Sequence, residues 1–148
     1  MFQTLASQIG LALVSATCLF AAWAGGRPQK IVAAICFTAW IASAAMQDLS
    51  FTGPDYDTLV LDIVLMVVFV AMAIKSRRAW ITGLAAFQAL TMASHFAMIL
   101  DHRIWPKAAI TAYLIWSYLV LACLFWGGVT GLLDRRRVAG DANREAGR

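Results

Sequence analysis

Polar residues recur on one face of an otherwise apolar segment, and one of them is His95. At about 100° per residue, Gln88, Thr91, His95 and His102 fall on one helical stripe. Asp62 lies in another apolar segment, predicted to run in the opposite direction, and at about 1.5 Å per residue it reaches a similar depth. A carboxylate in hydrocarbon is costly, and a histidine N–H relieves that cost by donating to it. We therefore expect Asp62 and His95 to form an intramembrane polar pair.

The polar intramembrane cluster of Asp62, Gln88, Thr91 and His95 is open to three interpretations. The cluster can relay protons or ions, His95 can bind a tetrapyrrole or a quinone, or the pair can simply orient two helices. Membrane cytochromes usually bind haem between histidines on different helices, whereas His102 follows His95 on the same helix. We expect no cofactor, with haem or another tetrapyrrole at His95 as the alternative.

The other potential ligands suggest no metal site. Acidic residues and a histidine gather on the side predicted to be outer: Asp48, Asp55, Asp57, Asp101 and His102. Carboxylates suit hard cations, but this spacing matches no calcium loop and Arg103 can neutralise Asp101, so we expect a solvated rim. The cysteines lie in apolar segments at spacings that match no metal motif: Cys18, Cys36 and Cys123.

No catalytic signature is present in the sequence. It contains no Ser-His-Asp set, no H-E-x-x-H motif and no glycine-rich phosphate loop. The chain has only two histidines, fewer than an intramembrane metalloenzyme usually needs. We expect a protein that is not an enzyme.

The segments that must position these residues are long and apolar. Hydrophobic residues make up 61% of the 148 residues and charged residues 14%, which is typical of a multi-pass membrane protein. Five segments are long enough to cross roughly 30 Å of hydrocarbon as helices, over residues 5–24, 31–46, 59–74, 79–100 and 108–133. We expect an all-α integral membrane bundle of five transmembrane helices over residues 1–133. A disordered basic tail is expected over 134–148.

The positive charges predict the orientation of the bundle. Ten of the twelve Lys and Arg residues fall on one side of the predicted spans, and only Arg103 and Lys107 fall on the other. The positive-inside rule then places the N-terminus outside and the C-terminus in the cytoplasm. The arginine run is expected to contact anionic lipid through Arg135, Arg136 and Arg137. Nucleic-acid binding is not expected, because no folded basic domain is present.

Small residues predict where helices pack closely. The segment that carries His95 also carries a stripe of alanines: Ala85, Ala89, Ala93 and Ala97. Gly127 and Gly131 form a second small-xxx-small motif, and both patterns suit close helix contacts in lipid. Tyr113, Trp116 and Tyr118 can line a pocket beside His95 or serve as ordinary packing residues.

Several stretches of the chain resemble a known group of membrane proteins. With "GGRPQKIVAAI", "AIKSRRAWITGLAAFQ", "SHFAMILD" and "IWSYLVL", the sequence is similar to small uncharacterised multi-pass proteins of alphaproteobacteria, especially of the sphingomonad type. The resemblance covers most of the chain. It implies a location in the bacterial inner membrane and carries no activity.

These features favour a non-enzymatic component of the inner membrane. The small-residue faces and short loops suggest that it associates with itself or serves as an accessory subunit of a larger membrane complex. The first alternative is a small proton- or ion-coupled channel or transporter, with a polar path around Asp62 and His95. The second is a protein that binds a tetrapyrrole or quinone through His95.

Overall fold

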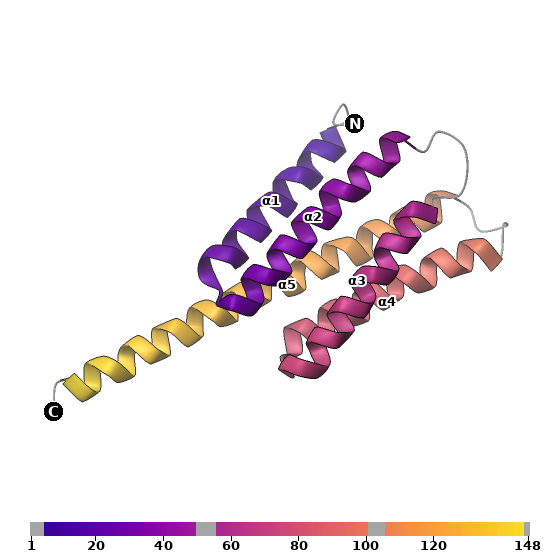
Figure 1. Ribbon diagram of the computed structural model, residues 1–148. Helices are drawn as coiled ribbons and strands as arrows, with labels where there is room; N and C mark the ends of the chain where they lie inside the picture. Colours follow the sequence, from indigo (N-terminus) through magenta and orange to yellow (C-terminus); the bar gives the residue numbers. More distant parts are fainter. Residues whose placement is uncertain (1–4, 50–55, 101–105, 147–148) are drawn as a thin grey trace.

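Helices account for all the regular structure that is described. The computed structural model describes residues 5–49, 56–100 and 106–146, and these form α1 (Leu5–Ala24), α2 (Arg27–Leu49), α3 (Tyr56–Ser76), α4 (Ala79–Leu100) and α5 (Pro106–Ala146) (Figure 1). No strand occurs in these ranges, as expected for an all-α chain. α1 and α4 begin and end at the predicted residues, whereas α2, α3 and α5 extend beyond the predicted segments.

Two short turns join consecutive helices. Gly25 and Gly26 follow the end of α1, and Pro28 occupies the first turn of α2, where a missing backbone N–H is tolerated. Between α3 and α4, Arg77 has a φ of 49°, in the left-handed region. This conformation lets its N–H donate to Ala73 O at 3.0 Å and closes the last turn of α3.

α5 lies between two pairs of helices (Figure 1). α1 and α2 pack against each other and against α5, while α4 packs against both α3 and α5. α2 also contacts α3, but α1 contacts neither α3 nor α4 in the described residues. The core takes apolar side chains from all five helices: Val14, Ala21, Val32, Phe69, Ile81, Leu84 and Leu124.

Three helices are long and apolar enough to cross a membrane. The stretches are Leu59–Ser76 in α3, Ala79–Leu100 in α4 and Thr111–Asp141 in α5. The apolar stretch of α1, Gln8–Ala24, is shorter, and α2 begins with the charged residues Arg27 and Lys30 among its first four. The described residues therefore support a membrane protein with three such helices, fewer than the five expected from the sequence.

The basic tail differs from the prediction of disorder over residues 134–148. α5 continues as one helix to Ala146, well beyond the predicted end of the last span at residue 133 (Figure 1). No proline interrupts the helix after Pro106, and Arg137 and Asp141 stand four residues apart, where opposite charges support a helix. Arg135 also bonds to the end of α1, which fixes the start of this extension.

Gly127 and Gly131 of α5 make the close contacts that their spacing predicts. Both are buried, and neither has room for a side chain. A Cβ on Gly127 would lie 2.7 Å from Cδ2 of Trp80, and a Cβ on Gly131 would lie 2.8 Å from Cα of Gly25. Gly127 therefore lets α5 approach α4, and Gly131 lets it approach the α1–α2 turn.

The alanine stripe of α4 packs inside the chain at only one position. Ala85 is buried, whereas Ala89, Ala93 and Ala97 are exposed. α3 and α5 cover the stripe that carries Gln88 and Thr91, so the opposite face of α4 has no helix against it in the described residues. The expected close packing along the whole stripe does not occur within the described chain.

Candidate functional site

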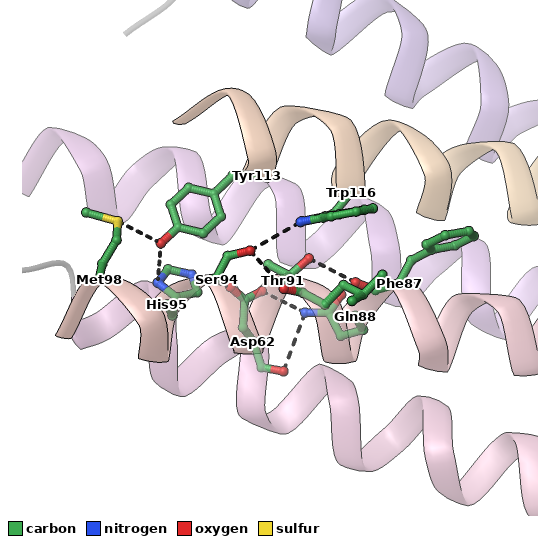
Figure 2. Close-up of polar contacts among 10 residues, drawn as sticks. Asp62, Phe87, Gln88, Thr91, Ser94, His95, Met98, Tyr113 and Trp116 are labelled. Carbon is green, nitrogen blue, oxygen red and sulfur yellow. Dashed lines mark hydrogen bonds and ion pairs between the residues drawn. The ribbon is translucent and has the colours of Figure 1, made fainter. Parts of the chain in front are cut away.

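Asp62 and His95 face each other across α3 and α4. His95 Nε2 lies 2.9 Å from Asp62 Oδ2, and each side chain is 14% exposed (Figure 2). α3 and α4 are joined by a tight turn and run antiparallel. Asp62, about one and a half turns from the start of α3, is therefore level with His95, about as far from the end of α4. This is the contact expected from the sequence.

Gln88 holds the second oxygen of Asp62. Its Nε2 donates to Asp62 Oδ1 at 2.8 Å, and Gln88 itself is only 5% exposed. The bond satisfies an amide that would otherwise be costly to bury. Thr91, on the same stripe, is also buried, but its hydroxyl donates to Phe87 O at 3.2 Å, one turn back along α4. Thr91 therefore lies beside Asp62 without bonding to it.

Tyr113 of α5 and Met98 of α4 extend this group of side chains. Tyr113 Oη lies 3.2 Å from His95 Nδ1 and 3.1 Å from Met98 Sδ (Figure 2). The rings of Tyr113 and His95 are stacked, with centroids 4.5 Å apart and planes at 26°. Both nitrogens of His95 thus have a protein partner. We call Asp62, Gln88, His95, Met98 and Tyr113 the Asp62 cluster.

A further bond ties α4 to α5 beside the cluster. Trp116 Nε1 donates to Ser94 Oγ at 3.2 Å, and Ser94 in turn donates to Leu90 O at 2.9 Å (Figure 2). Tyr118, the third aromatic residue expected to line a pocket here, is exposed. Tyr113 and Trp116 therefore contact the His95 region, and Tyr118 is not among its bonded residues.

The carboxylate of Asp62 has no Lys or Arg partner in the described part of the chain. Its partners are the amide of Gln88 and the imidazole of His95. Toward the α3–α4 turn the interior is apolar, and Phe69, Ile81 and Leu84 are almost fully buried there. The cluster therefore lies near the end of the bundle where α3 begins and α4 ends, and apolar packing separates it from the other end.

A second polar region lies at the α1–α2 turn and was not predicted from the sequence. Gln29 is 1% exposed; its Nε2 donates to Gly127 O at 3.2 Å and its Oε1 accepts from Gly26 N at 3.1 Å. One side chain thus satisfies backbone groups of α5 and of the turn. The available signal was a glutamine directly after "GGRP". We call Gly25, Gly26, Gln29, Gly127, Gly131 and Arg135 the glycine junction.

Arg135 closes the glycine junction by capping α1. Its guanidinium donates to Trp23 O at 3.1 Å and to Gly25 O. These are carbonyl groups at the C-terminal end of α1, where a positive charge is favourable. Arg135, Arg136 and Arg137 are all exposed, and their expected contact with anionic lipid stays a prediction; Arg135 in addition bonds to the protein.

The remaining predicted residues add no metal site to the described structure. The side chains of the acidic rim lie outside the described residues: Asp48, Asp55, Asp57, Asp101 and His102. Within the ranges that are described, no three or more His, Cys, Asp or Glu side chains gather as metal ligands. The thiols of Cys18, Cys36 and Cys123 are free.

No protein-family model, curated protein or solved structure matches this chain. Its function is therefore inferred from the geometry of its own side chains.

Proposed function

We propose that the chain is a non-enzymatic, multi-pass membrane protein that binds a small cation in the Asp62 cluster, as an ion-coupled channel or transporter does. The observation that supports this most directly is the Asp62 carboxylate, which is 14% exposed between helices and, among the described residues, is bonded by Gln88 and His95.

Charge balance is the physical basis of the proposal. Moving a carboxylate out of water costs several kcal/mol, and neutral hydrogen bonds recover only part of this. Gln88 supplies donors but no charge, and the imidazole of His95 supplies a charge only when it is protonated. A cation that enters the cluster therefore offsets the free-energy cost of burying the Asp62 carboxylate. The occupied state is then more stable than the empty state, which is what a binding site requires.

The surroundings of the cluster favour a site that is reached from one end. Apolar side chains fill the bundle between the cluster and the α3–α4 turn, among them Phe69 and Leu84. A continuous polar path would be needed for an open pore. The packing therefore supports a carrier or a gated site better than a permanently open channel.

We further propose that all five helices cross a bacterial inner membrane, with the N-terminus outside. α1 and α2 lie along α5. They expose large apolar side chains, including Leu19 and Ile31, which suit a lipid environment. Lys75, Arg77 and Arg78 at the α3–α4 turn are exposed, which fits a cytoplasmic side. The Asp62 cluster would then open toward the outer face.

Haem binding at His95 has less support than cation binding. Asp62 Oδ2 lies 2.9 Å from Nε2 and Tyr113 Oη lies 3.2 Å from Nδ1, so a macrocycle bound at either nitrogen would have to displace a whole side chain and clear a wide space beside it. A single ion needs no such space. The second histidine, His102, lies outside the described residues.

Self-association is a second candidate, favoured by one observation. Ala89, Ala93 and Ala97 are exposed although small residues at this spacing commonly pack against a helix. A neighbouring copy or another membrane subunit would cover this face. Cross-linking from a cysteine at Ala93 would detect such a neighbour in native membranes.

Cation uptake into vesicles tests the proposed function. The purified chain is reconstituted into liposomes, and uptake of H⁺, Na⁺, K⁺, Ag⁺ and Cu⁺ is measured. We expect the wild-type protein to take up at least one of these ions and the Asp62→Asn variant to lose that uptake. Asp134→Asn is the matched control, because it removes an exposed carboxylate of α5. Equal uptake by wild type and Asp62→Asn for every ion would contradict the proposal.

A further inference from the structure

We propose that the Asp62 cluster binds a soft monovalent metal ion, Cu⁺ or a chemically similar ion, through His95 Nδ1 and Met98 Sδ beside the hydroxyl of Tyr113. This proposal names the ion and the ligands of the cation site proposed above, and it rests on that site. The hydrogen bonds and distances around His95 support it.

Asp62 fixes the imidazole in the orientation that a metal ligand needs. A histidine that binds a metal through one nitrogen usually donates its other N–H to a carboxylate or carbonyl. His95 Nε2 lies 2.9 Å from Asp62 Oδ2, and Gln88 holds the other oxygen of that carboxylate at 2.8 Å. With its N–H turned toward Asp62, His95 presents the lone pair of Nδ1 on the opposite side of the ring.

The hydroxyl of Tyr113 lies between two atoms on that side of His95. The hydroxyl of Tyr113 carries one hydrogen and lies within reach of two acceptors, His95 Nδ1 at 3.2 Å and Met98 Sδ at 3.1 Å. The hydrogen can bond well to only one of them. When the hydroxyl donates to Met98 Sδ, it has no hydrogen left for Nδ1. The lone pair of Nδ1 is then available to a Lewis acid that takes the place of the contact with Tyr113.

The arrangement of the donor atoms suits one shared ion. Met98 follows His95 by three residues, so both side chains leave the same face of α4. Tyr113 Oη lies 3.2 Å from His95 Nδ1 and 3.1 Å from Met98 Sδ, so both proposed ligand atoms lie beside the same hydroxyl. In Figure 2 the three side chains converge at one point between α4 and α5.

The chemical nature of the donors selects the ion. Imidazole nitrogen and thioether sulfur favour Cu⁺ and similar soft ions, whereas Zn²⁺ and hard cations need more nitrogen, thiolate or carboxylate ligands. The described part of the chain offers no cluster of three such ligands. Asp62 then supplies one negative charge behind His95 to balance one positive charge on the metal.

Metal titration in detergent micelles tests this assignment on a chain whose free thiols, Cys18, Cys36 and Cys123, are replaced by alanine, because thiols bind Ag⁺ and Cu⁺ tightly. Ag⁺ serves as a redox-inert probe, and Cu⁺ is added under reducing conditions against a chromophoric chelator. We expect one ion per chain, with affinity lost in His95→Ala and lowered at least about tenfold in Met98→Leu. Asp62→Asn should weaken binding by about 10- to 100-fold, since it changes only the group that orients the ligand. X-ray absorption should show one sulfur neighbour that disappears in Met98→Leu.

Control variants separate binding from folding. Met72→Leu makes the same chemical change in α3, about ten residues from Asp62, and should leave the affinity unchanged. Each variant is checked for the same elution volume and helical content as the wild type. Affinity that is unchanged in folded Met98→Leu, or that is equal for Ag⁺ and Zn²⁺, would overturn the soft-metal assignment. Uptake of H⁺ or Na⁺ that depends on Asp62, without Ag⁺ binding, would overturn it too while leaving the proposed cation site standing.

Discussion

The Asp62 cluster and the glycine junction are both polar, yet they differ in what their side chains bond to. In the glycine junction, Gln29 and Arg135 bond to backbone carbonyl and N–H groups of neighbouring segments. In the Asp62 cluster, side chains bond to side chains: Gln88 and His95 to Asp62, and Tyr113 to His95. Backbone groups do not gain or lose a proton at ordinary pH, whereas an imidazole and a carboxylate can.

The two regions also differ in packing. Cβ atoms have no room at Gly127 and Gly131, and Gln29 is nearly fully buried. His95 and Asp62 each keep 14% of their side-chain surface exposed. The glycine junction is therefore the more tightly packed of the two regions, and the Asp62 cluster keeps more of its side-chain surface exposed. Variants in each region should separate stability from cation binding.

The largest expected effect comes from filling the glycine junction. Gly131→Val places a side chain against Gly25 Cα, where even a Cβ would lie at 2.8 Å. We expect a loss of about 3 kcal/mol in unfolding free energy, because backbone atoms cannot move aside as a flexible side chain can. Thermal unfolding in detergent measures this. A variant as stable as the wild type would mean that α5 and the α1–α2 turn are not in close contact.

Replacing one buried glutamine by leucine in each region gives the most direct comparison. Gln29→Leu and Gln88→Leu each leave buried groups without a partner and should each cost about 1–2 kcal/mol. Only Gln88→Leu should also weaken Ag⁺ binding, by about tenfold, because it frees the carboxylate that orients His95. Stability and affinity are measured on the same preparations. Equal affinities in the two variants would remove the functional distinction between the regions.

The smallest effect is expected at the exposed edge of the glycine junction. Arg135→Met keeps an apolar side chain of similar length but loses the bonds to Trp23 O and Gly25 O. The cost should be about 0.5–1 kcal/mol, as for other charges at a helix C-terminus, and should shrink when salt is added. Thermal unfolding with and without salt tests this. If the loss of unfolding free energy did not depend on the salt concentration, Arg135 would stabilise the protein by packing and not by its charge.

The Asp62–His95 contact could be expected from the sequence because it follows from counting along two antiparallel helices. A tight turn, a fixed rise per residue and two rare ionisable residues are enough to bring Asp62 level with His95. Gln88 followed from the same stripe of α4. Met98 was missed because a methionine in an apolar helix resembles ordinary packing, and only its position three residues after His95 distinguishes it.

The glycine junction could not be predicted because its bonds depend on which helices become neighbours. Gln29 reaches Gly127 across 98 positions, and Arg135 reaches Trp23 across 112. Hydropathy says that such segments are helices, but it does not say which helix lies beside which. The alanine stripe of α4 was mispredicted for the same reason. Its spacing permits close packing, but Ala93 and Ala97 are exposed because no described helix lies on that side.

α5 connects the two regions mechanically. Tyr113 contacts the Asp62 cluster near one end of this helix, Gly131 and Arg135 hold it at the α1–α2 turn, and the helix then projects to Ala146 (Figure 1). The distance from Tyr113 to Ala146 is about 50 Å along an unbroken helix. The glycine junction holds α5 between its contact with the Asp62 cluster and its projecting end. If α5 tilted by about 5° about the junction, the end of the projecting 11 residues would move by roughly 1–2 Å, in the direction opposite to the movement of Tyr113.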